Sequence, residues 1–126
     1  MAENYHEPFE ILSDQTKDMH RALTSLGEEL EAINWYRQRA DVCKDDNLRE
    51  ILLHNMREEM EHAAMVLEWI RRRDTDFAGH LKTYLFTEGA VTELEEQAQQ
   101  GSEDGTKAQG SGAPRQELSV GIMKGW

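Results

Sequence analysis

A stripe of apolar residues with the spacing of an α-helix runs through residues 52–70 and has a carboxylate near its centre. Successive residues of a helix are about 100° apart, so Glu59 lies about 20° from Leu52 on the helical wheel. An unpaired charge on such a face costs on the order of several kcal/mol, so Glu59 requires a compensating partner. The other members of the stripe are Met56, Ala63, Val66, Leu67 and Ile70.

His62 follows Glu59 by three residues and therefore lies on the same helix face. Helix bundles bind iron or manganese with inward-facing Glu-x-x-His pairs of this kind. Glu59 and His62 are thus candidate metal ligands. The alternative is that Glu59 pairs with an arginine and His62 is a hydrogen-bonded interface histidine, and the spacing alone does not choose between these readings.

The order of apolar patterns and capping residues predicts an all-α protein. Ser13 or Asp14 can cap a first long helix that runs to about Ala40, and its apolar stripe is Met19, Leu23, Leu26, Leu30 and Ile33. A turn over residues 41–47, in which Asp45, Asp46 and Asn47 are candidate caps, leads to a second long helix that ends near Arg72. Asp74 or Thr75 can cap a third, shorter helix, and a weak helical piece follows Gly89.

Two long helices joined by a short turn form an antiparallel hairpin, which is half of a four-helix bundle. Half a bundle leaves its apolar stripe exposed, and a carboxylate-bridged di-metal site uses two Glu-x-x-His pairs where this chain has one. We therefore expect a symmetric dimer that completes a four-helix bundle, with Glu29, Glu59 and His62 of both subunits around two metal ions.

Other residues on the first long helix are candidates for supporting roles. Glu28, Glu31 and Trp35 project from a flank beside the stripe, where the glutamates are either an outer cation site or a solvated face. Tyr36 lies near Glu29 on the wheel and is either a hydrogen-bond donor to a ligating carboxylate or ordinary interface packing.

Composition limits the classes of partner. The chain of 126 residues has a net charge of -11, which argues against nucleic acid and anionic membrane surfaces and is compatible with metal cations. The single cysteine, Cys43, excludes an internal disulfide framework and fits a reducing compartment. Neither a secretion signal nor an apolar run of membrane-spanning length is present, so a cytoplasmic protein is expected.

The last part of the chain differs in composition from the rest. Residues 97–117 are rich in Gln, Gly, Ser, Glu and Asp, which predicts a flexible linker because so few apolar residues cannot offset the entropy of ordering. Apolar residues return in 118–126, as expected of a short docking segment on a tether. The predicted organisation is a helical domain over 1–96, a linker over 97–117 and a docking peptide over 118–126.

At these residues the sequence resembles the encapsulated ferritins. The similar stretches are Glu28-Glu29-Leu30-Glu31-Ala32 with Trp35-Tyr36, then Glu58 to Met65, Leu67-Glu68-Trp69, and Tyr84 to Glu88, so the resemblance covers nearly all of residues 7–90. It implies a two-helix protomer whose dimer rebuilds a ferritin-like four-helix bundle, with dimers arranged as a ring of five. It also implies a di-iron ferroxidase centre at the dimer interface with one iron per subunit.

The resemblance also implies residue roles and a partner. The ligands at the centre would be Glu29, Glu59 and His62, the outer metal site Glu28 and Glu31, with Trp35 nearby and Tyr36 close to the iron. Residues 118–125 resemble the cargo-loading peptide of encapsulin shells, with apolar positions at Leu118, Val120 and Met123, and depart from its usual pattern at Ile122 and Met123.

These observations predict a ferroxidase that oxidises Fe(II) with dioxygen and delivers iron for storage inside an encapsulin nanocompartment. Two alternatives remain at this point. One is a di-metal oxygenase or peroxidase on the same bundle, and the other is a non-enzymatic helical adaptor that only binds the shell.

Overall fold

The computed structural model describes residues 5–109, and side chains as far as residue 101. It contains a short 3-10 helix, η2 (Phe9–Ile11), and four α-helices: α1 (Asp14–Val42), α2 (Asp46–Arg73), α3 (Thr75–Tyr84) and α4 (Val91–Gln109). No strand occurs between residues 5 and 109, so the expected all-α class is confirmed. The chain forms two compact units, which divide between Trp69 and Ile70.

The first long helix begins where its capping residue predicts. The Ser13 side chain accepts a hydrogen bond of 3.1 Å from the backbone N–H of Thr16, which satisfies one of the free donors of the first turn. The helix ends at Val42, where the N–H of Cys43 still reaches the carbonyl of Ala40 at 3.4 Å. The predicted helix is therefore correct to within two residues at its C-terminal end.

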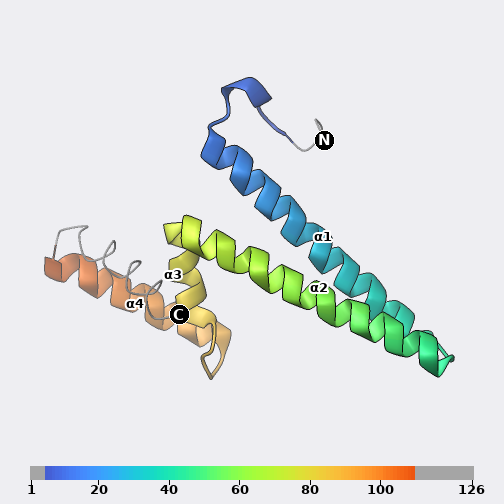
Figure 1. Cartoon of the computed structure of the whole chain (residues 1–126). Coiled ribbons are helices and arrows are strands. Elements are labelled where there is room, and N and C mark those ends of the chain that lie inside the picture. The colour runs from blue at the N-terminus through green and yellow to red at the C-terminus, as the bar shows by residue number, and fades with distance from the viewer. Residues whose placement is uncertain (1–4, 110–126) are drawn as a thin grey trace. The chain divides into compact units, whose positions relative to one another are not determined.

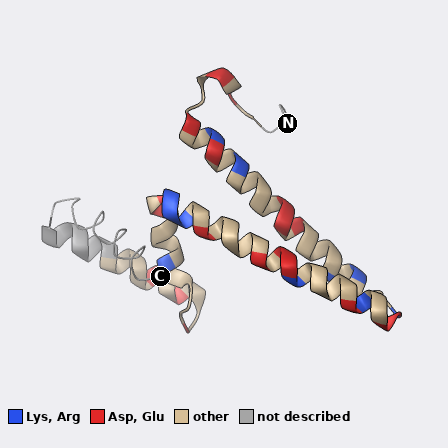
Figure 2. Cartoon of the chain, in the orientation of Figure 1, with Lys and Arg blue, Asp and Glu red and all other residues tan. Residues whose placement is uncertain are grey.

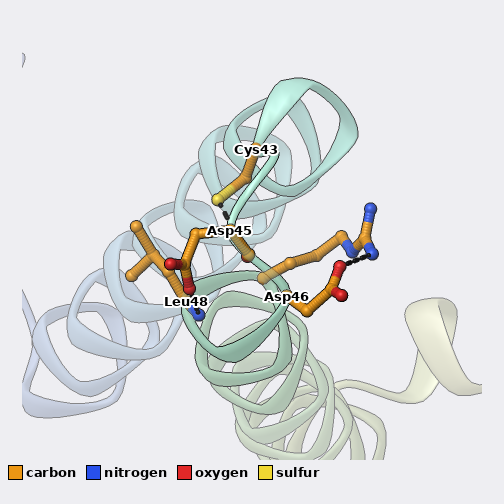
Figure 3. Close-up of polar contacts among 5 residues, drawn as sticks. Cys43, Asp45, Asp46 and Leu48 are labelled. Carbon is orange, nitrogen blue, oxygen red and sulfur yellow. Dashed lines mark hydrogen bonds and ion pairs between the residues drawn. The ribbon is translucent and has the colours of Figure 1, made fainter.

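Three residues, 43–45, connect α1 to α2 (Figure 3). Asp45 Oδ1 accepts a hydrogen bond of 2.8 Å from the backbone N–H of Leu48, so Asp45 caps α2. One residue later, Asp46 pairs with Arg49 at 2.7 Å. The Cys43 thiol donates to the Asp45 carbonyl at 3.5 Å. These local contacts stabilise the turn and keep the connection between the two long helices short.

In the first unit, α1 and the following helix run antiparallel (Figure 1). The buried residues of this unit are small or flexible: Ala40, Met56 and Ala63. Several large apolar side chains on the same helices are exposed instead: Leu23, Leu30, Ile51 and Met65, by 47%, 54%, 55% and 63%. A single chain thus buries only part of its apolar surface, as expected for half of a helix bundle.

The second unit begins with the last turn of α2. Its buried apolar residues are Ile70 and Ala78. Asp74 separates α2 from α3 and accepts a hydrogen bond of 2.9 Å from the N–H of Phe77, as its predicted capping role requires. The next connection contains Phe86 in the left-handed region, with φ of 60°, and the last helix of the unit contacts α3.

The fourth helix is longer than the sequence pattern predicts. Residues 97–109, expected to begin a flexible linker, continue α4 as helical backbone. The physical reason is that a composition too polar to build a core can still form a local helix, since Glu, Gln and Ala have favourable helix propensities. The docking peptide predicted over 118–126 and the end of the predicted linker lie outside the described residues.

None of the helices between residues 5 and 109 combines the length and apolar character that crossing a bilayer requires.

Candidate metal centre

Three potential metal ligands from two helices meet on the first unit. Nδ1 of His62 lies 3.7 Å from Oε2 of Glu29 and 3.6 Å from Oε2 of Glu59. Each of the three side chains offers one ligand atom, and these atoms all lie within 4.8 Å of one another. Among the side chains that the structure describes, residues 5–101, this is the only such group of three or more His, Cys, Asp or Glu side chains.

Helix geometry explains how the two ligands on α2 meet. Glu59 and His62 are separated by three residues, so their side chains lie one above the other on one face. Met56 and Ala63, about one turn before and after Glu59, are both 8% exposed. Glu59 therefore lies in line with the buried face of its helix, where the sequence pattern puts it.

Glu29 is the ligand that tertiary structure supplies. It comes from α1, and the antiparallel hairpin brings it opposite His62. The side chains of Glu29 and Glu59 are 23% and 25% exposed, whereas that of His62 is 46% exposed. The carboxylates are thus partly shielded from water, and the imidazole lies at the open edge of the group.

The donor set fits a first-row divalent metal ion. Such ions bind carboxylate oxygen and imidazole nitrogen at about 2.0–2.2 Å, so two ligands of one ion lie about 3–4 Å apart. The two separations from His62 Nδ1, 3.6 and 3.7 Å, fall in this range and are longer than a good hydrogen bond. Two carboxylates close together also repel each other, and a bound cation relieves this repulsion.

Chemically, two carboxylates and one imidazole form a hard, mixed oxygen and nitrogen set that suits iron, manganese or zinc. Three protein ligands leave coordination positions open for water, for a substrate or for ligands from another chain. The group is therefore suited to binding an ion that reacts at this site or is later released from it.

The remaining residues predicted at the site all lie on α1 but outside the group of three. Glu28 and Glu31 are exposed and no third His, Cys, Asp or Glu joins them in a cluster within the described part of the chain. Trp35 is 49% exposed, and Tyr36 is half-buried. Acidic residues nevertheless occur near the middle of both long helices, where Figure 2 shows red segments on the ribbon.

Two features of this region were missed from the sequence. The guanidinium of Arg39 lies over the rings of both Trp35 and Tyr36, at 5.9 and 5.6 Å from their centroids. Nε2 of His54 lies 3.6 Å from Oε1 of Glu58, and the two side chains are 64% and 48% exposed. Spacings of three and four residues on a helix are the signal that could have found both contacts.

The predicted shell-docking residues Leu118, Val120 and Met123 lie outside the described residues.

Comparison with known proteins identifies a matching protein family and a similar solved structure. Residues 4–88 match the family model described as EncFtn-like. A crystal structure of protein ne0167 from Nitrosomonas europaea superposes with a TM-score of 0.67 at 59% sequence identity, covering 69% of this chain and 96% of that one.

The names of three relatives refer to ferritin-like proteins or to encapsulin cargo. An "Encapsulated ferritin-like protein" of Rhodospirillum rubrum is 50% identical, over 95% of this chain and 87% of its own length. A "Ferritin-like protein" of Thermotoga maritima is 52% identical, over 82% of this chain and 91% of its own. The "Encapsulin nanocompartment cargo protein EncC" of Myxococcus xanthus is 36% identical, over 79% of each chain.

The fold, the family match over most of the helical region and the level of identity to these relatives together establish that this chain belongs to the EncFtn-like family of encapsulated ferritin-like proteins.

Proposed function

We propose that the protein is a ferroxidase that oxidises Fe(II) to Fe(III) with dioxygen. The single observation that carries this proposal is the convergence of Glu29, Glu59 and His62, whose ligand atoms lie within 4.8 Å of one another. Membership of a ferritin-like family supports iron as the substrate metal.

The chain's own side chains account for binding and charge. Carboxylate oxygens bind iron in both valences, and the partly shielded pair Glu29 and Glu59 balances the higher charge of the oxidised ion. Each Fe(II) gives up one electron. Two ferrous ions therefore supply the two electrons that, with two protons from water, reduce one dioxygen to hydrogen peroxide.

We further propose that two subunits share the centre. One chain supplies a single Glu-x-x-His pair, whereas di-iron sites of helix bundles use two. The open edge at His62, which is 46% exposed, leaves room for ligands of a second copy. The exposed Leu23, Leu30, Ile51 and Met65 provide apolar surface that an isologous dimer would cover.

The exposed glutamates of α1 would lead iron to this centre. Glu28 and Glu31 lie on the same acidic stretch as Glu29, and negative charge raises the local concentration of a divalent cation. Their role would be to attract and pass on Fe(II), and Trp35 and Tyr36 would lie beside that path.

Encapsulin shells are the proposed destination. The relatives named as encapsulated and as encapsulin cargo support this assignment, and so does the apolar end of the sequence at residues 118–126. In this proposal, Leu118, Val120 and Met123 bind the inner wall of the shell, where oxidised iron accumulates. Ten subunits in a ring, inside a cytoplasmic nanocompartment, remain the expected assembly.

The test is an anaerobic titration of metal-free full-length protein with Fe(II), followed by exposure to air. Absorbance reports oxidation and light scattering reports subunit number. Saturation near one iron per chain with rapid oxidation by an oligomer is the expected result. Oxidation no faster than in buffer would overturn the proposal in favour of a cargo adaptor, and a requirement for peroxide or an organic substrate would favour a di-metal peroxidase or oxygenase.

A further inference from the structure

The guanidinium of Arg39 on α1 lies over two aromatic rings. Arg39 follows Trp35 by four residues and Tyr36 by three, so it lies between them around the helix and one turn further on. Helical side chains lean towards the N-terminus, which directs the guanidinium back over both rings. The distances to the ring centroids, 5.9 and 5.6 Å, are within the range of cation–π contacts.

These rings lie just beyond the candidate metal centre. Tyr36 follows Glu29 by seven residues, which puts it on the same helix face about 10 Å further along the axis. Tyr36 is half-buried and Trp35 is 49% exposed. The two rings therefore extend from the helix face that carries Glu29 to the protein surface.

Indole and phenol rings at this position are exposed to a side reaction of iron oxidation. After one ferrous ion has given an electron to dioxygen, a second electron and two protons complete its reduction to hydrogen peroxide. A ring could supply this electron in place of the second ferrous ion, and would release its indole or phenol proton to the same oxygen molecule, while water supplies the other proton. The immediate outcome is a neutral ring radical and an iron left ferrous, and a second molecule of dioxygen then traps this radical as an oxygenated side chain.

We infer that Arg39 protects Trp35 and Tyr36 from this oxidation and so directs the electrons of the reaction to come from iron. The inference rests on the proposed ferroxidase function. Loss of an electron leaves a positive charge on the ring before any proton departs, and the guanidinium opposes that charge. At 5.6 Å, and even at the dielectric constant of water, a unit charge makes the electron loss about threefold less favourable. Arg39 therefore acts on the two rings through its charge and does not itself take part in the reaction.

The experiment compares the full-length protein with three variants. Arg39→Gln removes the charge, Arg39→Lys keeps it, and Arg37→Gln removes a neighbouring exposed charge on the same helix. Each metal-free protein is loaded with one Fe(II) per chain without oxygen, exposed to air for repeated cycles and digested. Peptide mass spectrometry then gives the oxidised fraction of Trp35 and Tyr36 per iron oxidised, with Trp69 as the internal reference.

At low ionic strength the oxidised fraction is expected to rise about threefold in Arg39→Gln and to stay near the wild-type value in Arg39→Lys and Arg37→Gln. No rise in Arg39→Gln would overturn the inference. An equal rise in the Lys variant, or in Arg37→Gln, would also overturn it, because the effect would then not depend on a charge at this position.

A second arm needs no iron. A photogenerated one-electron oxidant is applied to the metal-free proteins, and the same oxidised peptides are measured. If the wild-type protein fails to oxidise iron, the proposed function fails, yet this arm still tests Arg39. Ring oxidation faster in Arg39→Gln than in Arg37→Gln is expected, and equal rates in the two variants would refute the protective role.

Discussion

Nδ1 of His62 on α2 lies 3.7 Å from Oε2 of Glu29 on α1, and this contact joins the two arms of the hairpin at the candidate centre. Glu59 and His62 meet through local helix geometry alone, since they lie on one helix three residues apart. Glu29 meets them only when the hairpin forms. The centre therefore depends on the fold of the protomer as well as on its ligands.

Replacing Glu59 with Ala is expected to reduce iron oxidation to the rate in buffer. The change removes one of three ligands and leaves a small apolar side chain on the buried face of α2. Circular dichroism should show the helices retained. Glu61→Ala is the matched control, because Glu61 is exposed on the same helix and outside the group. Wild-type oxidation by the Glu59 variant would contradict the assignment.

Glu31→Gln is expected to slow iron oxidation without abolishing it. Glu31 is exposed and outside the group of three, so its loss weakens the attraction of Fe(II) but leaves the ligands in place. Stopped-flow absorbance over a range of Fe(II) concentrations should show a lower initial rate with the same number of irons bound. A lost binding site would instead identify Glu31 as a ligand.

Leu30→Gln is expected to weaken self-association and slow oxidation together. Leu30 is 54% exposed in the single chain, and covering it with a second copy contributes apolar burial that Gln loses. Light scattering over a dilution series measures the oligomer, and absorbance measures activity in the same samples. An unchanged oligomer would exclude Leu30 from the interface.

Asp45→Ala is expected to destabilise the protein by about 1 kcal/mol, because α2 loses the side chain that accepts from the N–H of Leu48. Asp41→Ala removes the same charge from an exposed position near the end of α1 and serves as the control. Chemical unfolding followed by circular dichroism measures both. Equal effects of the two substitutions would show that charge, rather than capping, is responsible.

Deletion of residues 118–126 is expected to abolish capture by an encapsulin shell and to leave iron oxidation unchanged. The three ligands all lie in the first unit, far from this segment in the sequence. Co-expression with a shell protein, followed by purification of the shells, measures capture. Shells that retain the shortened protein would rule out docking through this peptide.

Much of the fold follows from local sequence signals. Ser13, Asp45 and Asp74 were each among the cap candidates that residue type offered, because Ser and Asp side chains accept hydrogen bonds from the free N–H groups of a first helical turn. The end of α4 was not predictable in the same way. Composition reports whether a segment can build a core, whereas helicity over residues 97–109 depends on local propensity.

The candidate centre was predictable in part. Glu59 and His62 follow from their spacing, and Glu29 follows from the expectation of a hairpin together with the family resemblance. The position of Arg39 over two rings was missed, because a basic residue near a helix C-terminus already has an adequate explanation in the helix dipole. The spacing of Arg39 from the two rings is compatible with the contact, but it does not by itself choose between the two roles.

The length of the two hairpin arms has a consequence for how this protein can vary. Glu29 precedes the last residue of α1, Val42, by as many residues as Glu59 follows the first residue of α2, Asp46, so both carboxylates lie about 20 Å from the turn. One residue inserted in a single arm would move its ligand by about 1.5 Å and rotate it by about 100° relative to the other. An insertion or deletion between a ligand and the turn that is confined to one arm would therefore separate the ligands, which makes arm length a shared property of the two helices.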